Sequence, residues 1–396
     1  MTELVITGGR VVDPGQGVDG RLDVHVRDGR IVALLEPDVA AVAAPGATQV
    51  DASGGVVLPG LIDLHGHWYD ASPYGLDPLA SLAGGATCAV DAGTAGYGNF
   101  EAFRRHVIEA SPVRVLAYVH VAAAGLAASM VGELEDIRYA RPRETAAIIR
   151  AHRDVVVGVK VRIGVGACGA NSAVALVKAV EAAELAGTPI MAHIADGADM
   201  PTVLAMLRPG DVVTHSLTGS GTGILDDEGR ISTAAWEARR RGILFDVGHG
   251  CGSFTWRTAG RAIDEGFAPD TISTDLHRYS ITHPVVDLPT TMAKLRHLGM
   301  SDAEVFAAVT SRAAAALGRD DVGSLAPGSR ADVTVLRPGV ATKLTDSAGI
   351  SQVVEAPWRP SLAVLDGVVW DPAAIRVPLR AFVDADHEVD CTAPLT

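Results

Sequence analysis

The chain has 396 residues, of which 48% are hydrophobic, 20% charged and 5% aromatic, and its formal net charge at pH 7 is −14. This length allows a large domain with a smaller one beside it, and the acidic balance argues against nucleic acid or a membrane surface as a partner. No apolar run reaches the roughly 18 residues of a membrane span, and residues 1–6 do not have the pattern of a signal peptide.

Residues 1–55 have the pattern of a small all-β segment. Short runs rich in β-branched residues, such as 4–6 and 30–34, are separated by glycine-rich turns. A segment of this size is too small to bury a hydrophobic core alone. We therefore expect it to pack against another part of the chain.

From residue 56 the pattern changes to short apolar runs that alternate with longer helical segments. The apolar runs are residues 56–65, 86–91, 113–120, 155–162, 189–193, 211–215, 243–247 and 271–275, and the helical segments include 100–110, 172–186, 234–241, 256–265 and 303–317. Eight buried strands alternating with helices predict an α/β fold with a parallel (β/α)8 TIM-like barrel. A doubly wound open sheet is the alternative. It gives no reason for the candidate metal ligands described below, which lie on five of these strands, to face one point.

After residue 317 the chain returns to a β pattern, most clearly at residues 331–336 and 363–370. We expect residues 1–55 and 320–396 to form one discontinuous β-sandwich, and residues 56–319 to form the barrel beside it.

The first barrel run ends in two histidines that have the spacing of metal ligands. His65 and His67 are two residues apart on a strand, so both side chains lie on the same face. The carboxyl ends of barrel strands form the face where barrel enzymes have their active sites. Two surface histidines would give the same pattern, but the apolar residues 56–62 that precede this pair make a solvated loop a poor alternative.

Three further runs also end in residues that bind metals. His193, His215 and Asp275 end the fifth, sixth and eighth runs. Each histidine alone could be a satisfied core residue, but together these residues predict a two-metal hydrolytic centre. Imidazole nitrogens and carboxylate oxygens suit Zn²⁺ best, with Mn²⁺, Fe²⁺ or Co²⁺ as alternatives.

Lys160, in the fourth run, is the most specific single residue. The chain has four lysines against 29 arginines, and this one follows the apolar residues 155–159. Burial of an ammonium is costly and lowers the pKa of a lysine. A neutral amine can add CO₂ to form a carbamate, whose two oxygens can bridge two cations. The alternative is a buried lysine paired with a nearby aspartate.

The cysteines bear on the cellular compartment. Cys88, Cys168, Cys251 and Cys391 are far apart and include no CxxC pair. This pattern favours a reducing compartment, so we expect a cytoplasmic protein. We also expect a homo-oligomer that acts on a small molecule.

These motifs resemble the binuclear branch of the amidohydrolase superfamily that carries a carboxylated lysine. The resemblance covers nearly the whole chain and rests on residues 6–14, 58–67, 311–318 and 323–333; residues 91–96, 158–162, 246–254 and 272–277 are similar to its deacetylase-like group, relatives of dihydroorotases and hydantoinases. The resemblance implies that His65, His67 and Asp275 hold one metal ion and that His193 and His215 hold the other. A carboxylated Lys160 would bridge the two.

The resemblance predicts a metal-dependent hydrolase of amide or ester bonds. We expect it to deacetylate an N-acyl amino acid or an O-acyl hydroxy acid by attack of a hydroxide shared by the metals, with Asp275 as the proton shuttle. The first alternative is a cyclic amidase that opens a hydantoin, dihydropyrimidine or dihydroorotate ring. The second is a binding protein that has lost its metals, but such a protein should lack one or more ligands, and all six are present.

Three further residues are candidates for substrate binding. Arg162 lies two residues beyond Lys160 on the same strand face and could bind a substrate carboxylate. His249 and His277 lie just past the ends of the seventh and eighth runs and could donate to the substrate or support the metal ligands. The alternatives are a structural ion pair for Arg162 and loop packing for the two histidines.

Overall fold

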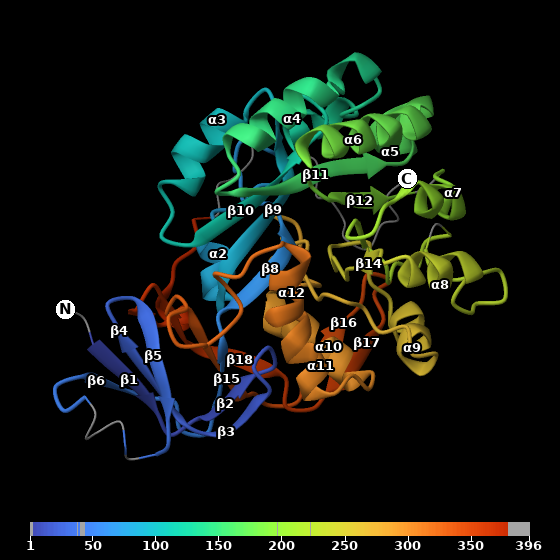
Figure 1. The fold of residues 1–396 in the computed structure, drawn as a ribbon. Helices are drawn as coiled ribbons and strands as arrows, with labels where there is room; N and C mark the ends of the chain where they lie inside the picture. Colours follow the sequence, from blue (N-terminus) through green and yellow to red (C-terminus); the bar gives the residue numbers. More distant parts are fainter. Residues whose placement is uncertain (1–2, 38, 40–43, 196, 222, 379–396) are drawn as a thin grey trace.

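The protein is described by a computed structural model that covers residues 3–378 except residues 38, 40–43, 196 and 222. Its centre is a curled parallel sheet of seven strands, in which each strand pairs with its neighbours in sequence (Figure 1). The strands are β8 (Leu61–Gly66), β9 (Ala86–Gly96), β10 (Arg114–His120), β11 (Val156–Ile163), β12 (Ile190–Ile194), β13 (Val212–Thr214) and β14 (Leu244–Phe245). This sheet confirms the predicted α/β barrel class.

The eighth predicted strand is not a regular strand, although its residues join the two edges of the sheet. Isolated parallel bridges link Asp246 to Thr271 and Gly66 to Leu276. The backbone leaves the extended conformation at Asp275, where φ is +48°. The chain therefore makes the contacts of a closing strand but turns sharply at the residue predicted to bind metal.

Helices lie outside the curled sheet (Figure 1). They are α2 (Leu79–Ala83), α3 (Phe100–Phe103), α4 (Pro142–Ala151), α5 (Val165–Cys168), α6 (Ser172–Ala186), α7 (Met200–Met206), α8 (Thr233–Arg240), α9 (Trp256–Asp264), α10 (Leu288–His297), α11 (Asp302–Ala308) and α12 (Ser311–Ala316), with a π-helical turn at Arg104–Ile108 and 3₁₀ turns at Gly125–Val131, Ile137–Tyr139, Gly169–Asn171 and Pro372–Ala374. Helix α6 matches its predicted range because buried alanine and leucine residues recur along one face, and Gly187 ends it in a left-handed conformation.

The predicted helix 303–317 is two helices. The carbonyl oxygen of Val309 accepts a hydrogen bond from the backbone N–H of Ile62, at 2.8 Å, instead of continuing the helical pattern. Thr310 has non-helical dihedral angles of −132° and −97°, and α12 begins directly after it. A contact with the start of β8 therefore breaks the helix, and sequence periodicity alone does not reveal such a contact.

Two further sheets lie beside the barrel. One has the order β5-β4-β1-β6 and the other β19-β18-β15-β7-β2-β3. Their strands are β1 (Glu3–Thr7), β2 (Arg10–Asp13), β3 (Val18–Arg21), β4 (Asp23–Arg27), β5 (Arg30–Leu35), β6 (Thr48–Asp51), β7 (Val56–Pro59), β15 (Val333–Pro338), β18 (Trp358–Leu365) and β19 (Val368–Trp370); a separate hairpin joins β16 (Thr342–Thr345) and β17 (Ser351–Val354). One hydrophobic cluster contains side chains from both ends of the chain, including Ile6, Val57 and Val333.

The apolar run 56–65 serves both parts of the fold. Its first half is β7, which lies between β2 and β15, and its second half is β8 of the barrel. Gly60 separates the two strands, and a Cβ at this position would clash with the side chain of Thr87. This glycine allows the chain to pass from one sheet to the next where β9 lies close by.

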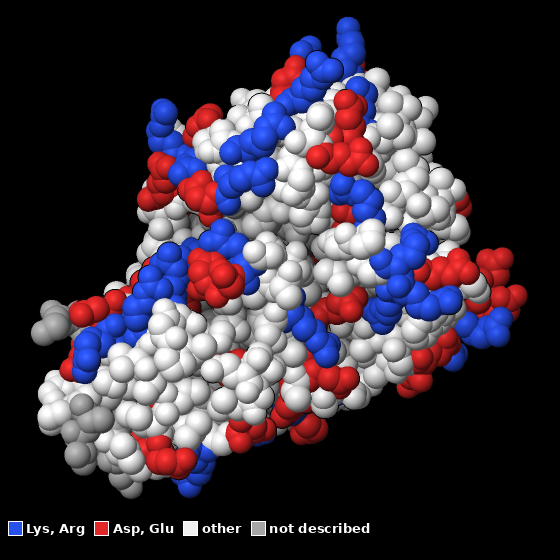
Figure 2. Space-filling view, in the orientation of Figure 1, with Lys and Arg blue, Asp and Glu red and all other residues white. Residues whose placement is uncertain are grey.

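On the face drawn in Figure 2, acidic and basic side chains lie next to each other in most places. Among the ion pairs of the described residues are those of Arg114 with Asp332, Arg319 with Asp321 and Arg330 with Asp366. Among the helices of the described residues, none has both the length and the apolar character needed to cross a bilayer.

Candidate metal centre

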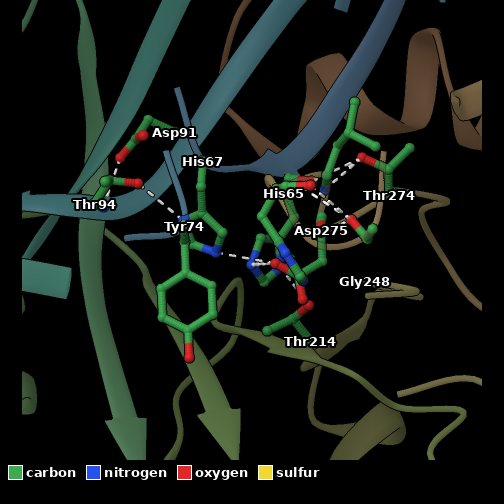
Figure 3. Close-up of polar contacts among 12 residues, drawn as sticks. His65, His67, Tyr74, Asp91, Thr94, Thr214, Gly248, Thr274 and Asp275 are labelled. Atoms are coloured by element: carbon green, nitrogen blue, oxygen red, sulfur yellow. Dashed lines mark hydrogen bonds and ion pairs between the residues drawn. The ribbon is translucent and has the colours of Figure 1, made fainter. Parts of the chain in front are cut away.

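The structure brings the six predicted ligands to one place at the carboxyl ends of the barrel strands. The ring centroid of His215 lies 5.0 Å from that of His65 and 4.4 Å from that of His193. His65 and His67 have centroids 5.5 Å apart, and Nζ of Lys160 lies 3.4 Å from Nε2 of His65. Figure 3 shows the central part of this group.

Asp275 contacts both His65, in β8, and His67, which directly follows this strand. Its Oδ1 is 3.2 Å from Nε2 of His65 and 3.0 Å from Nε2 of His67. Its backbone N–H donates to the carbonyl of His65 at 2.7 Å, which fixes the turn. Burial, the largest single effect, opposes ionisation, but His65, His67 and His215 together outweigh it and hold the pKa of Asp275 well below its usual range. Asp275 is therefore a carboxylate.

The Nδ1 atoms of the histidines are bound to groups outside the centre. His215 Nδ1 donates to the carbonyl of Gly248 at 2.6 Å, which leaves a lone pair on Nε2. His65 Nδ1 lies 2.7 Å from the hydroxyl oxygen of Thr214, whose proton is donated to Asp246 at 2.9 Å. Nδ1 of His65 is therefore the protonated nitrogen, and its Nε2 is also a free acceptor.

With the ring protons on Nδ1, the Nε2 atoms of His65 and His215 can both donate a lone pair to a cation. Nε2 of His65 and Oδ1 of Asp275 are both acceptors, and they face each other at 3.2 Å. Two such atoms repel each other unless a proton or a cation lies between them. Ligand atoms of His65, His215 and Asp275 all lie within 4.8 Å of one another. The donor set, three neutral or anionic side chains with aligned lone pairs, fits a divalent ion.

Burial also keeps the histidines in the form that binds metals. It is the largest cause that lowers the pKa values of His65 and His193 well below their usual range and that of His215 to about 4. Neutral imidazoles carry the lone pair that a metal ion needs.

Asp246 is a functional candidate that the sequence analysis did not assign. It is fully buried and accepts hydrogen bonds from the hydroxyls of Thr214, Thr271 and Ser273 at 2.9, 2.7 and 2.7 Å. Burial raises its pKa to about 6, while the three donors stabilise the charged form. Its role is to hold Thr214, and through it His65, in place. An acid within an apolar run was the only sequence signal for it.

Thr94 supports His67 in the same way that Thr214 supports His65. Its hydroxyl lies 2.9 Å from Nδ1 of His67, and its backbone N–H donates to Asp91 at 2.7 Å (Figure 3). Asp91 also accepts from the backbone N–H of Trp68 at 2.9 Å. The strand β9 therefore positions the second histidine of the HxH pair.

Lys160 is buried beside this group. Burial lowers its pKa to about 7, against the opposing effect of Asp275. Within the described part of the chain, no carboxylate oxygen lies within the 4.0 Å of an ion pair with its Nζ. Gly93, with φ of +80°, makes room for it, because a Cβ there would lie 2.6 Å from Cβ of Lys160. The structure thus contains a buried lysine with an accessible neutral form.

Arg162 makes the ion pair that was the structural alternative for this residue. One terminal nitrogen of its guanidinium donates to Oε1 of Glu133. The Glu133 side chain is fully buried, whereas 22% of the Arg162 side chain is exposed. Glu133 lies in a loop after β10, and sequence reasoning had no signal for it. The register of β11 and β12 places Arg162 opposite His193, so the pair lies next to the centre.

His249 and His277 lie in different surroundings. Both ring nitrogens of His249 are bound by protein groups, Nδ1 to the carbonyl of Gly250 at 2.8 Å and Nε2 to Nζ of Lys294 at 2.7 Å. The ring of His277 lies 6.3 Å from that of His67 and 5.4 Å from that of Tyr74.

The protonation of His277 follows from its neighbours. Its Nδ1 accepts from the backbone N–H of Tyr279 at 3.2 Å, so Nε2 carries the proton. Burial lowers its pKa to about 4. His277 is therefore a neutral N–H donor close to the metal candidates, and Tyr74, which the sequence analysis did not name, packs against it.

Comparisons with known proteins show what this chain is similar to. A model of the amidohydrolase family matches residues 255–359. A deacetylase of Agrobacterium fabrum is 36% identical over 345 residues, which cover 85% of this chain and 84% of that protein. The crystal structure of an adenine deaminase has 29% identity and a TM-score of 0.86, covering 94% of this chain and 100% of that one. The crystal structure of a dihydroorotase has 32% identity and a TM-score of 0.85, covering 94% and 99%.

Proposed function

Because this chain belongs to the amidohydrolase family, we propose that it is a metal-dependent hydrolase that removes an acetyl group from an N-acyl amino acid or an O-acyl hydroxy acid. The observation that carries the chemistry is the pair of acceptors, Nε2 of His65 and Oδ1 of Asp275, that face each other at 3.2 Å. The choice of deacylation rests on the 36% identity to a deacetylase over most of both chains.

We propose that the centre holds two divalent ions, Zn²⁺ first among them. His65, His67 and Asp275 would hold one ion and His193 and His215 the other, with a carbamate on Lys160 between them. Bound there, the ions would acidify a water molecule and polarise the carbonyl of the substrate. The low pKa values of the histidines and the buried amine of Lys160 support this assignment.

The protein side chains then move the proton and hold the substrate. Asp275, a carboxylate in the free protein, accepts the proton of the attacking water and delivers it to the leaving nitrogen or oxygen. His277 can donate from Nε2 to a substrate oxygen. Arg162, oriented by Glu133, binds the substrate carboxylate with its remaining N–H groups.

His249 does not act on the substrate directly in this scheme. Its two ring nitrogens already have partners, so we propose that it positions the glycine-rich loop 248–250. That loop contacts the centre closely, because a Cβ added to Gly250 would clash with the Asp275 carboxylate.

The test is acetate release by the zinc-reconstituted protein from N-acetyl amino acids and O-acetyl hydroxy acids, with both enantiomers of each. We expect release with a strong preference for one enantiomer and release slower by about 100-fold or more in the Asp275→Asn variant. Absence of acetate release from the whole panel would contradict the deacylase proposal.

A cyclic amidase is the second candidate, and the similarity to a dihydroorotase structure over 94% of the chain favours it. Ring opening of dihydroorotate and hydantoin should therefore be measured in parallel. Ring opening without acetate release would move the protein to the cyclic amidases and leave the metal centre unchanged. We propose that either reaction takes place in the cytoplasm.

A further inference from the structure

His120, at the end of β10, is a buried histidine that the mechanism above does not use. Its side chain is fully buried. Its Nδ1 accepts a hydrogen bond from the backbone N–H of Ala122 at 2.9 Å, so the ring proton is on Nε2. Among the residues that the structure describes, this Nε2 has no hydrogen-bond partner. A buried donor without a partner is unfavourable, so we expect a partner in the functional state.

The missing partner has to lie near Lys160. β10 and β11 are parallel, and their register places His120 directly opposite Lys160. Side chains at paired positions of neighbouring strands leave the sheet on the same face. A Cβ added to Gly93 would meet both side chains, at 2.6 Å from Cβ of Lys160 and 3.3 Å from Cβ of His120. The imidazole and the lysine chain therefore run side by side into the centre.

The tautomer of His120 restricts what it can do. Its Nδ1 accepts the backbone N–H of Ala122 and so carries no proton, which makes the imidazole neutral with its one proton on Nε2. Neither of its nitrogens is therefore a free base. This excludes His120 as a metal ligand in the tautomer that the structure requires. It remains a hydrogen-bond donor that needs an acceptor.

The protonated form of Lys160 cannot be that acceptor, because an ammonium has only donors, and the neutral amine offers a single lone pair. A carbamate can, because its two oxygens carry several lone pairs. In its formation the neutral Nζ attacks the carbon of CO₂, a C–O π pair moves to oxygen, and Nζ releases one proton to solvent. The two metal ions that we propose would use only part of the acceptor capacity of the carbamate.

We infer that His120 is a positioning residue for Lys160, and that its Nε2–H donates a hydrogen bond to the carbamate formed on that lysine. This inference rests on the carbamate of the proposed function. The hydrogen bond satisfies the unpartnered donor, orients the carbamate between the two groups of metal ligands, and favours carboxylation over the free amine.

The test is carboxylation itself and does not require turnover. The zinc-loaded protein is titrated with ¹³C-bicarbonate, and the carbamate carbon is quantified by ¹³C NMR, with Lys160→Ala used to assign the signal. His120→Met, which removes the donor, should need at least ten times more bicarbonate for half-maximal signal. His120→Gln, which keeps an N–H donor, should need within threefold of the wild-type concentration.

Tyr118→Phe is the matched control. Tyr118 lies two residues earlier on β10, is buried, and has a hydroxyl without a hydrogen-bond partner in the described chain. Its loss should leave carboxylation unchanged. Circular dichroism and a melting curve verify that each variant is folded.

Three results would overturn the inference. An unchanged titration for His120→Met would show that the donor has no role, and equal losses in His120→Met and His120→Gln would show that packing matters instead of the hydrogen bond. A wild-type protein without a carbamate signal would refute both the carbamate and the inference. A clear carbamate in a protein that releases no acetate would refute only the deacylase proposal.

Discussion

At the scale of single residues, the proton on each histidine decides whether the centre can bind a cation. His215 donates its Nδ1 proton to Gly248, and His65 donates to Thr214. Their Nε2 lone pairs are left to face Asp275 and each other. Groups behind the ligands therefore prepare the site before any ion arrives.

Thr214→Val tests this arrangement with a change of nearly equal size. The variant removes the acceptor of His65 Nδ1 and one donor to Asp246, so the imidazole loses its fixed orientation. We expect zinc affinity to fall about 10- to 100-fold in competition with a chelator. Thr145→Val, which removes a buried hydroxyl on α4 that donates to the carbonyl of Arg141, is the control and should bind zinc like the wild type. Equal affinity in all three proteins would contradict the role of Thr214.

Asp275→Asn separates metal binding from proton transfer. The amide keeps an oxygen near His65 and His67 but cannot take a proton from water. We expect metal to be held at least in part, while kcat falls by about 100-fold or more. Metal content by elemental analysis and steady-state kinetics on the same sample check this. An unchanged rate would remove Asp275 as the proton shuttle.

Lys160→Ala tests the bridging group. The variant should lose bound metal and nearly all turnover, because the carboxylate that would join the two halves of the site is missing. Short carboxylates such as formate should restore part of both, since they can occupy the space of the carbamate. Full activity without an added carboxylate would contradict a carbamate on Lys160.

The sequence could predict the ligand candidates but not their supports. His65, His67, His193 and His215 each follow an apolar run, which places them at strand ends. Support from Thr214, Asp246 and Glu133 depends on which strands and loops become neighbours in space, and no local pattern encodes this. His120 also ends an apolar run, but only its missing hydrogen-bond partner distinguishes it from an ordinary core histidine.

At the scale of elements, Lys294 on α10 ties together three segments around the centre. Its Nζ lies 2.7 Å from Nε2 of His249, 2.9 Å from the carbonyl of Pro284 and 2.7 Å from the carbonyl of Thr345 in β16. Nδ1 of His249 is a donor, so all three partners of the lysine are acceptors. They match the three protons of an ammonium, whereas burial favours the neutral amine.

The pH dependence of stability tests whether burial or the three acceptors determine the charge of Lys294. Burial lowers its pKa to about 7 from an ordinary value of 10.5. Between these values the folded protein binds fewer protons than the unfolded chain, so the free energy of unfolding rises with pH, by at most about 1.4 kcal/mol per pH unit. We expect the free energy of unfolding of the wild type, minus that of Lys294→Met, to rise from pH 7 to pH 10.

The control for this measurement is Lys343→Met, because Lys343 is exposed on β16. Its difference from the wild type should not change with pH over the same range. A flat profile for Lys294→Met as well would contradict the lowered pKa and show that the three acceptors keep the ammonium charged.

Most elements of the barrel could be predicted from the sequence, and the exceptions have local causes. Periodicity identifies α6 because it packs one continuous face against the sheet. It merges β7 with β8 because both are apolar, although Gly60 divides them between two sheets. It also extends the last run through Asp275, where a positive φ needed to place the carboxylate interrupts the strand.

At the scale of the whole molecule, the sheets beside the barrel are joined to it by buried charge. Arg114, at the start of β10, forms an ion pair with Asp332 at 3.1 Å, and only 5% of the Asp332 side chain is exposed. Asp332 also accepts from the backbone N–H of Asp366 at 3.0 Å. These contacts connect the amino end of the barrel sheet to residues near β15 and β18.

Arg114→Met should destabilise the protein by about 3 kcal/mol, because it leaves the buried carboxylate of Asp332 without its counterion. Urea unfolding followed by circular dichroism and tryptophan fluorescence measures this. We expect both probes to report one shared transition, since the two parts of the fold are coupled. Arg138→Met, which removes an exposed partner of Asp136, is the control and should change stability little. A loss as small as that of the control would contradict the coupling.

The central claim is that six side chains from distant parts of the sequence form one two-metal centre. The most direct measurement is the crystal structure of the zinc-reconstituted protein, with anomalous scattering at the zinc edge. We expect two zinc peaks per chain, one at His65, His67 and Asp275 and one at His193 and His215, with a carbamate on Lys160 between them. A single peak, or zinc bound away from these residues, would contradict it.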